Sequence, residues 1–430
     1  MEADVNWDEC LQHAAVSDIG MRRASNQDSH AEVLASDVET WRRSGHLFVV
    51  ADGMGAHAAG ELASEMAVSG ITHRYYKYHH LSPPDALRKA IQDTNTDVYQ
   101  RGQANVGFHN MGTTASTLVL LPQGALVAHV GDSRVYRQRG NQLEQLTFDH
   151  SLAWEIQASG QFRGNAEFAN AVPKNIITRS LGPNETVRID FEGPFPLVPD
   201  DTFLLCSDGL TGLVEDEEIG PLLASLPPGT AAQALADLAN LRGGHDNITV
   251  VVVRVTGPSP ASHHGGHSDS PTTEHAEPPD RITLLAWIAA SVSTLAALAM
   301  LVLKRGGPAV VAIIVGVVAV LLAIIRRWAR TPDDAQATES RRFGKGPYVT
   351  VQSPVNTTFT GKLAELVNQL RSVIEEEQWG VDIQEFDAQC RAAEQAVKQN
   401  KHETALRHYV NAVSAIMHEL RMHNDKDSPR

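Results

Sequence analysis

Leu47-Phe48-Val49-Val50-Ala51 forms a continuous apolar run that leads directly into Asp52-Gly53. The same kind of junction recurs at the runs Ala125–Val130 before Gly131-Asp132, Phe203–Ser207 before Asp208-Gly209, and Ile248–Val253 after Asp246-Asn247. An aspartate at the edge of a buried strand is costly unless its charge is compensated, and four of them together would repel one another strongly. A pair of hard divalent cations relieves that repulsion most simply, so the junctions predict a metal-centred active site.

Composition limits the classes of function. The chain has 430 residues, enough for two or three domains with a large buried core. Its formal net charge of −15, with no basic domain, argues against nucleic acid as the main partner. Cys10, Cys206 and Cys390 form no CxxC pair, which favours a reducing compartment and excludes a cysteine-rich zinc site. Residues 1–9 lack the apolar segment of a signal peptide.

Residues 12–255 are predicted to form one α+β domain. Strand-like runs are expected at 47–51, 113–121, 125–130, 187–191, 202–206 and 248–255, and helices at 58–73, 84–101, 151–159 and 230–240. Short turns between consecutive strands, as at Pro122-Gln123-Gly124, favour antiparallel pairing over βαβ units. In an antiparallel sheet, the end of one strand lies beside the start of its neighbour. An aspartate that follows a strand and an aspartate that precedes the neighbouring strand therefore lie at the same edge.

Residues 256–281 are rich in Pro, Gly, Ser and His and are predicted to be a flexible linker. The linker's His263-His264-Gly265-Gly266-His267 cluster could bind a metal. A solvated linker is favoured, because nothing rigid orients the imidazole rings.

Two apolar stretches follow, at 282–303 and 309–325, joined by the polar turn Lys304–Pro308. As a helix the first would be about 33 Å long, enough for the hydrocarbon core of a membrane, and the second is slightly shorter. Together they predict a transmembrane helical hairpin over 282–325. The alternative, a buried soluble helix pair, would need a surrounding core that the flanking linkers do not supply.

The topology of this hairpin is predicted from its basic flanks. Arg281 and the cluster Arg326–Lys345 outnumber the two cations of the turn, so both ends are expected to be cytoplasmic. The predicted localisation is the inner (plasma) membrane, multi-pass, with the catalytic domain and the C-terminus in the cytoplasm. Residues 326–360 are then a juxtamembrane linker.

The region 361–423 is predicted to be helical. One amphipathic stripe comprises Leu363, Leu366, Val367, Leu370 and Ile374. The spacing of Ala405, Tyr409, Ala412 and Ile416 is a weak sign of a TPR-like helical hairpin. A small interaction module and a self-packed helical cap are both compatible with this pattern.

Short motifs surround the four aspartates in a definite order. They are Ser17-Asp18-Ile19-Gly20-Met21-Arg22-Arg23-Ala24-Ser25-Asn26-Gln27-Asp28, Asp52-Gly53-Met54-Gly55, Gly112-Thr113-Thr114, Gly131-Asp132-Ser133-Arg134, Asp149-His150-Ser151, Ile177-Thr178-Arg179-Ser180-Leu181-Gly182, Ser207-Asp208-Gly209-Leu210 and Asp246-Asn247-Ile248-Thr249. This ordered set resembles the motifs of the metal-dependent Ser/Thr protein phosphatases of type 2C. The form of the second motif with Met54 resembles that of the bacterial branch. The resemblance covers about 12–255 and does not extend to the hairpin or the tail.

The resemblance implies a four-layer α-β-β-α sandwich of two antiparallel sheets with helices outside. It also implies two Mn²⁺ or Mg²⁺ ions at the sheet edge, and a third, weaker ion. By this resemblance Asp52 would bridge the two ions, and the Gly53 carbonyl, Asp208 and Asp246 would complete the inner ligands. Asp28 would hold metal-bound water, and Asp132 would bind the third ion together with Asp208. Arg23 would bind the substrate phosphate. Oxygen ligands suit Mg²⁺ or Mn²⁺, whereas zinc favours His or Cys.

The same resemblance implies hydrolysis without a phosphoenzyme. Two cations lower the pKa of a bridging water, and the resulting hydroxide attacks phosphorus in line while arginine stabilises the equatorial oxygens. Met54 replaces a histidine proposed as general acid in some members, so leaving-group protonation must come from elsewhere; His57 is favoured as structural. Gln27 replaces a common acidic residue, and Ala56 a frequent glycine.

Simpler interpretations apply to several of these residues. Any single Asp-Gly pair after a strand is usually only a turn. Arg134 is expected to pair with a nearby carboxylate. Arg179 is expected either to lie in a flap that covers the site or to have a packing role. A cysteine-phosphatase mechanism at Cys206 would need an arginine six residues later, where Gly212 stands. Cys206 is therefore expected to be a small core residue.

The leading hypothesis is a membrane-anchored phosphatase that removes phosphate from phosphoserine and phosphothreonine in proteins and opposes a Ser/Thr kinase. The expected partners are phosphorylated proteins, such a kinase and its substrates, and the membrane through 282–325, with no nucleic acid. The alternative is a catalytically weak phosphatase-fold scaffold that recruits partners through its helical tail. The intact set Arg23, Asp52, Asp208 and Asp246 argues against the scaffold.

Overall fold

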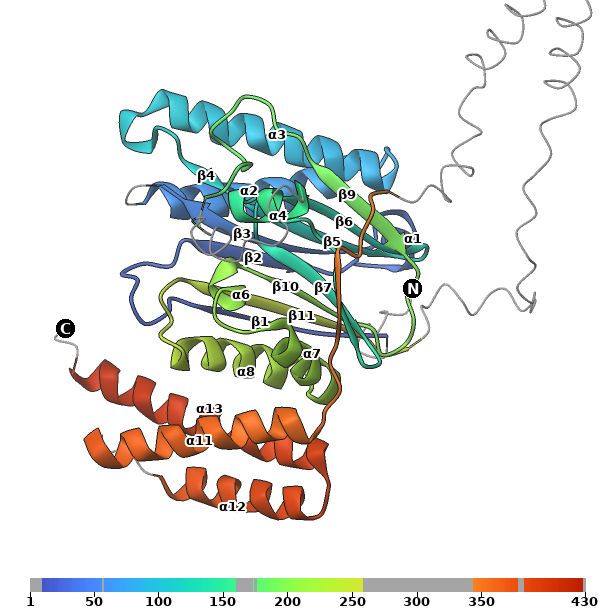
Figure 1. The fold of residues 1–430 in the computed structure, drawn as a ribbon. Helices are drawn as coiled ribbons and strands as arrows, with labels where there is room; N and C mark the ends of the chain where they lie inside the picture. Colours follow the sequence, from blue (N-terminus) through green and yellow to red (C-terminus); the bar gives the residue numbers. More distant parts are fainter. Residues whose placement is uncertain are drawn as a thin grey trace, which may run out of the picture. The chain divides into compact units, whose positions relative to one another are not determined.

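Two antiparallel β-sheets stack face to face in the computed structural model, which describes residues 10–55, 58–159, 173, 176–257, 343–377 and 383–427 (Figure 1). The first sheet has the order β1 (Leu11–Asp18), β11 (Ile248–Val255), β10 (Thr202–Cys206), β7 (Arg134–Arg139), β8 (Gln142–Gln145), β12 (Val349–Gln352). The second has the order β2 (Asp28–Val33), β3 (His46–Met54), β5 (Ala115–Leu121), β6 (Gly124–Val130), β9 (Asp190–Phe195), with β4 (Gly112–Thr113) paired to β3. The predicted pair of antiparallel sheets is confirmed.

Alternation along each strand divides its side chains between two layers. In β3, Phe48 and Val50 face the other sheet, whereas Leu47 and Val49 pack against helices. In β10, Phe203 likewise joins the inter-sheet core, which also contains Leu118, Leu205 and Val251. Fully apolar runs therefore arise because both faces of the central strands are buried.

Helices cover the outer face of each sheet, as Figure 1 shows. On the second sheet lie α2 (Ala59–Lys77) and α3 (Pro83–Ala104), and on the first lie α7 (Asp216–Ser225) and α8 (Pro228–Leu241). Ser82 caps α3 and Pro83 starts it, while Glu215 and Glu218 form a capping box at α7. The shorter helices are α1 (Val38–Ser44), η2 (Val106–Phe108), α4 (Leu152–Ser159) and α6 (Asp208–Thr211).

Several elements differ from the sequence-based expectation. β3 extends through Asp52-Gly53 to Met54, so this aspartate lies within a strand and not after it. β9 begins at Asp190, whereas a strand was expected over 187–191. β7 and β8 were not expected because their sequences, RVYRQR and QLEQ, are mostly polar. Ion pairs such as Arg137 with Glu144 satisfy those side chains across the two strands.

The segment 343–353, called here the C-terminal strap, joins the first sheet. β12 pairs antiparallel with β8, and Phe343 forms a bridge with Gly193 at the edge of the second sheet. The buried Glu192 accepts hydrogen bonds from the Gly346 amide at 2.8 Å and the Tyr348 hydroxyl at 2.5 Å. The expected juxtamembrane linker over 326–360 contained no strand, because four residues of mixed polarity give little signal.

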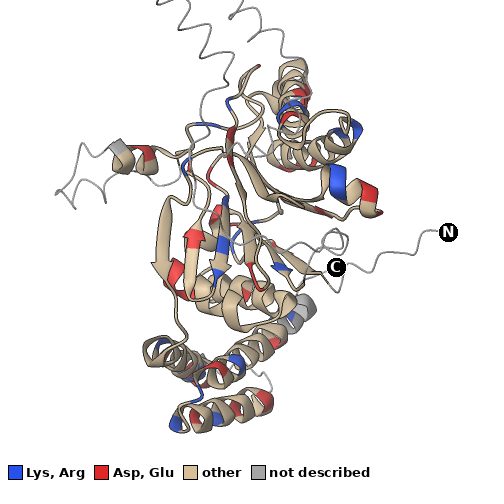
Figure 2. Cartoon of the chain, turned by 90° about the vertical axis from the view of Figure 1, so that its right-hand side faces the viewer, with Lys and Arg blue, Asp and Glu red and all other residues tan. Residues whose placement is uncertain are grey.

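Three further helices follow the strap: α11 (Thr357–Glu377), α12 (Gln384–Lys398) and α13 (His402–Asp427). Their apolar stripes pack together and against α7 and α8, forming one hydrophobic cluster with the outer face of the first sheet. Figure 2 shows acidic and basic residues interspersed along these helices. They form an additional layer outside the four-layer sandwich (Figure 1).

The predicted transmembrane hairpin over 282–325 lies outside the described residues. Within the described part of the chain, no helix combines the length and apolar character needed to cross a bilayer. The four helices that are long enough, α2, α3, α11 and α13, carry charged residues throughout. The predicted multi-pass membrane localisation is wrong by this finding, which holds for every helix in the described part of the chain.

Candidate metal centre

Asp52 and Asp28 lie opposite each other at one edge of the second sheet, where β3 pairs with β2. The Asp52 amide donates to Thr114 Oγ1 at 2.8 Å, and its carbonyl accepts from the Thr114 amide at 2.9 Å. The following Gly53 amide donates to the Gln27 carbonyl at 3.1 Å. A Cβ on Gly53 would lie 2.1 Å from the Gly60 carbonyl oxygen, so only glycine permits this close approach of α2.

Asp208 and Asp246 lie at the corresponding edge of the first sheet. β10 ends at Cys206 and pairs antiparallel with β11, so Asp208 after β10 and Asp246 before β11 share one end of the pair. Ser207 ties the two sheets together: its Oγ donates to Asp28 Oδ2 at 2.7 Å. The predicted meeting of strand ends and a strand start at a common edge is confirmed.

Asp132 follows β6 in the turn that leads to β7. His150 holds this turn from both sides, because its Nδ1 accepts from the Gly131 amide at 2.9 Å and its amide donates to the Gly131 carbonyl at 2.7 Å. The Asp132 side chain is buried and interacts electrostatically with Asp208 and Asp52. All four aspartates of the strand junctions, with Asp28, are thus brought together.

Burial and mutual repulsion disfavour charge on this group of carboxylates. Burial is the larger cause in each case: it raises the pKa of Asp28 to about 7 and that of Asp132 to about 8, and neighbouring Asp208 adds to both. Burial, reinforced by Asp28, raises the pKa of Asp52 well above its usual value. Burial and Asp246 raise the pKa of Asp208. A positive charge at this position would reverse these effects.

The five aspartates Asp28, Asp52, Asp132, Asp208 and Asp246, called here the carboxylate group, fit a pair of hard cations. Asp28 Oδ1 and Asp132 Oδ1 are buried and have no hydrogen-bond partner, a property that suits oxygens able to face a cation or its bound water. Among the described residues, no three His, Cys, Asp or Glu side chains are already arranged around a single ion position. The fit therefore rests on donor type, proximity and the unsatisfied oxygens.

Arg23 faces the group from the loop between β1 and β2. Its Nη2 donates to Asp246 Oδ2 at 2.7 Å, and its side chain is 47% exposed. The hydrogen bond to Asp246 is the main cause that raises the pKa of Arg23, which is charged at any physiological pH. A half-exposed guanidinium beside buried carboxylates is suited to an anionic ligand.

The family model for protein phosphatase 2C matches residues 21–240, slightly more than half of the 430-residue chain. The match includes every residue of the carboxylate group except Asp246, and it includes Arg23. The chain belongs to the protein phosphatase 2C family.

The phosphatase is 38% identical over 241 residues to a putative protein phosphatase 2C-type of Streptococcus pyogenes, a match that covers 55% of this chain and 94% of that protein. It is 38% identical over 213 residues to serine/threonine phosphatase stp of Listeria welshimeri, covering 48% and 83%. The crystal structure of Stp1 from Staphylococcus aureus is 30% identical with a TM-score of 0.51, covering 60% of this chain and 98% of that one.

The catalytic domain of the phosphatase PstP, solved in complex with two manganese ions, is 31% identical, covers 58% of this chain and 99% of that one, and has a TM-score of 0.48. By its family the protein is a metal-dependent Ser/Thr protein phosphatase of the bacterial type, and the members of this family use two Mn²⁺ or Mg²⁺ ions as cofactors. The match to the family model ends at residue 240, before the C-terminal strap and helices α11–α13.

Sequence reasoning missed the part that Asn247 plays in the phosphatase. Its Nδ2 donates to the Ile19 carbonyl at 2.9 Å and to the Ser25 carbonyl at 3.0 Å. Its Oδ1 accepts from the Gln27 amide at 2.9 Å. Asn247 thereby holds the loop that carries Arg23. The only signal was its place beside Asp246 in an ordered motif.

The remaining residues of the motifs have structural partners. Arg134 pairs with Asp149 at 2.7 Å, as expected. Arg179 pairs with Asp190 at 2.9 Å, beside His150. Burial raises the pKa of the Cys206 thiol, which agrees with its expected place in the core. His57 lies outside the described residues.

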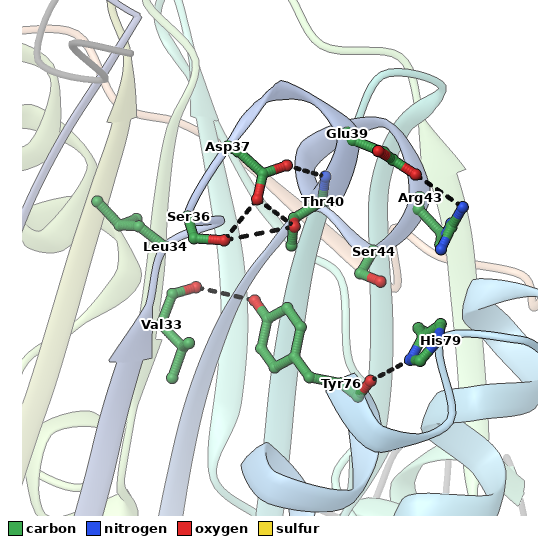
Figure 3. A pocket seen from close by; sticks show the side chains of 10 residues that line it. All are labelled: Val33, Leu34, Ser36, Asp37, Glu39, Thr40, Arg43, Ser44, Tyr76 and His79. Carbon is green, nitrogen blue, oxygen red and sulfur yellow. Dashed lines mark hydrogen bonds and ion pairs between the residues drawn. The ribbon is translucent and has the colours of Figure 1, made fainter. Parts of the chain in front are cut away.

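A cavity of about 630 Å³ lies beyond the C-terminal end of β2, away from the aspartates. It is lined by Val33, Leu34, Ser36, Asp37, Glu39, Thr40, Arg43, Ser44, Tyr76 and His79 (Figure 3). Val33 ends β2, whereas Asp28 begins it, so the cavity and the carboxylates are at opposite ends of the strand. Asp37 caps α1, and Tyr76 donates to the Val33 carbonyl at 3.1 Å. These internal bonds explain the polar lining.

Proposed function

We propose that this phosphatase hydrolyses phosphoserine and phosphothreonine in proteins at the sheet edge occupied by Arg23 and the carboxylate group. The supporting observation is the convergence of five buried or half-buried aspartates on one edge, with a half-exposed arginine bonded to one of them. The carboxylates supply hard oxygen donors, and the arginine supplies a phosphate-binding group.

The ligand roles are those that the family resemblance implies, and the positions of the residues support them. Asp52 interacts with all the other aspartates, so it would contact both ions, and the Gly53 carbonyl, Asp208 and Asp246 would complete the inner set. Asp28 and Asp132 each keep a buried, unpartnered oxygen, which suits a water-holding role for Asp28 and a third, weaker ion for Asp132. When bound, the two ions lower the pKa of a water and supply the attacking hydroxide near neutral pH.

Arg23 positions the phosphoryl group. One Nη2 proton is used by Asp246, and the guanidinium has further N–H donors that can reach two phosphate oxygens at once. These donors stabilise the charge that develops on the equatorial oxygens during in-line displacement. Asp246 keeps the guanidinium at the edge of the carboxylate group.

A covalent phosphocysteine route is disfavoured. The Cys206 thiol is fully buried, and burial raises its pKa, so the thiolate nucleophile is not available. Hydrolysis by activated water needs no nucleophilic side chain. The substrates are made by Ser/Thr kinases, so we propose that the enzyme opposes such a kinase.

The full-length protein can be assayed with p-nitrophenyl phosphate and with a phosphothreonine peptide, each with Mn²⁺, with Mg²⁺ or with EDTA. We expect turnover that depends on metal, is abolished by EDTA, and falls at least about 100-fold in Asp208→Ala. Activity that ignores EDTA or survives Asp208→Ala would contradict the two-ion site. The scaffold alternative predicts turnover that stays weak or absent with either metal.

A further inference from the structure

Helix α13 reaches the base of the loop that carries Arg23. Arg421 Nη2 donates to Asp237 Oδ1 on α8 at 2.8 Å and to Asp18 Oδ2, the last residue of β1, at 3.1 Å. Ser414 of the same helix donates to Asp237 Oδ2 at 3.0 Å. The C-terminal helix is therefore bonded both to the sandwich and to the start of this loop.

Asp18 in turn shapes the loop. Its second oxygen, Oδ1, accepts from the Gly20 amide at 2.9 Å. Gly20 has φ of +79°, and a Cβ there would lie 2.1 Å from the Asp246 carbonyl oxygen. The two oxygens of Asp18 thus link Arg421 to a tight turn that lies directly against the backbone of Asp246.

The segment 19–27, called here the arginine loop, packs along 244–247. The Met21 amide donates to the Gly244 carbonyl at 2.7 Å, and Asn247 binds two loop carbonyls. Asn247 holds the inside of the loop, and Asp18 holds its base. Arg23, at the exposed part of the loop, depends on both anchors for its position over Asp246.

Among the described contacts, Arg421 is the only cation bonded to Asp237 or Asp18, and Gln233 and Ser414 give Asp237 neutral hydrogen bonds. Asp237 is 1% exposed and Asp18 is 19% exposed, so the loss of Arg421 leaves two acidic groups facing each other, one of them fully buried. Burial raises the pKa of Asp237, and Arg421 is the largest of the contacts that oppose this. Repulsion would turn the more exposed Asp18 away and release the Gly20 amide.

We infer that Arg421 is a positioning residue for phosphate binding, through which the C-terminal helix holds the arginine loop in its binding conformation. The inference rests on the proposed role of Arg23 in phosphate binding. It assigns the helices outside the phosphatase domain a part in setting substrate affinity.

The test compares Arg421→Met with Arg407→Met in the full-length chain. Arg407 is a matched control, because it lies on the same helix and bonds the sandwich through the Ser225 carbonyl, away from the arginine loop. For a phosphothreonine peptide with saturating Mn²⁺, we expect Arg421→Met to raise KM about three- to tenfold with kcat within about twofold. Arg407→Met should leave both values unchanged, and Arg421→Lys should restore part of the affinity.

A second measurement does not depend on catalysis. Hydrogen exchange of the amides in 18–27 should become faster in Arg421→Met than in wild type or Arg407→Met, while α3 is unchanged. Asp18→Asn should raise KM in the same direction, and the double variant should be no worse than Arg421→Met alone. These two readouts keep the inference testable where Arg421→Met is poorly folded.

The outcomes separate the inference from the proposed function. Unchanged KM and unchanged exchange in Arg421→Met would overturn the inference, as would equal effects of Arg407→Met. A wild-type protein that hydrolyses no phosphopeptide would overturn the proposed function, and the exchange measurement would still show whether Arg421 holds the loop.

Discussion

Asp52 is the residue on which the site's energetics depend most. It is buried and interacts with four other aspartates, so without cations its charged form is strongly disfavoured. Cation binding pairs these charges and stabilises the folded state by mass action. Removing one carboxylate should therefore have opposite effects with and without metal.

We predict that Mn²⁺ at about 100 times its Kd raises the melting temperature of the wild-type protein by about 5 °C, because it removes carboxylate repulsion. Asp208→Asn should melt higher than wild type in EDTA and gain less from Mn²⁺. Differential scanning fluorimetry measures both. Equal Mn²⁺ shifts in the two proteins would show that Asp208 does not contribute to cation binding.

His46 carries a second effect at the residue scale. It is 2% exposed, stacks on Trp41 at 4.5 Å, and accepts from the Ala35 amide through Nδ1 at 2.9 Å. Burial lowers its pKa to about 4. In the unfolded chain the His46 imidazole has its ordinary pKa near 6.5, so below that pH the unfolded state binds more protons than the folded state. The free energy of unfolding therefore falls as the pH falls from 6.5 towards 4.

We predict that preferential protonation of His46 in the unfolded state lowers the free energy of unfolding by about 1 kcal/mol between pH 6 and pH 5. His46→Asn keeps an acceptor near Nδ1 but cannot be protonated, so its loss over that range should be smaller by this amount. Urea denaturation of both proteins at the two pH values gives the comparison. Parallel pH profiles would contradict a neutral buried imidazole.

At the scale of elements, the arginine loop depends on Gly20 for its turn. The residue combines φ of +79° with a close approach to the Asp246 backbone. Gly140, in the turn between β7 and β8, has a comparable φ of +54° but open space around it. The two glycines separate the cost of backbone conformation from the cost of a steric clash.

We predict that Gly140→Ala lowers the unfolding free energy by about 1 kcal/mol, the cost of a left-handed backbone conformation for a residue with a Cβ. Gly20→Ala should be worse by a further ~1–2 kcal/mol and should also raise KM, because the loop must shift away from Asp246. Urea denaturation and peptide kinetics measure the two effects. Equal stability losses and an unchanged KM would argue against the clash.

At the scale of the whole molecule, the strap and α11–α13 complete the sandwich. β12 covers the edge of β8, and the three helices share a hydrophobic cluster with α7 and α8. Within the described part of the chain, the buried Glu192 accepts hydrogen bonds from two groups of the strap, the Tyr348 hydroxyl and the Gly346 amide. Burial raises the pKa of Glu192, and these bonds oppose the shift.

We predict that a chain shortened to residues 1–263 melts lower than the full chain and binds the dye ANS more strongly, since it exposes the outer faces of α7 and α8. Tyr348→Phe in the full chain tests the strap alone and should cost about 1–2 kcal/mol, because it removes one bond to a buried carboxylate. A shortened chain with an unchanged melting temperature and ANS signal would show that the sandwich is complete without them.

The sequence by itself predicted an α+β domain with antiparallel strands and aspartates gathered at one edge, and its resemblance to the type 2C phosphatases implied the two-sheet architecture. Runs such as Leu47–Ala51 must be buried on both faces, and the aspartates at their ends can be gathered only around cations. Such patterns are local and periodic, so they can be recognised without coordinates. The polar strands β7 and β8 were not predicted, because their charged side chains find partners only in the folded chain: Arg137 pairs with Glu144 across the two strands, and Arg139 pairs with Asp201, 62 positions away.

Only the tertiary structure decided which segments complete the domain and hold the site. The bonds of Ser207 to Asp28, of Asn247 to the arginine loop and of Arg421 to Asp18 join residues 179, about 225 and 403 positions apart. No local pattern encodes such pairs, because each depends on how strands and helices are placed in space. The use of the C-terminal helices as a layer on the phosphatase domain has the same physical origin: their apolar stripes show that they are buried, but not against what.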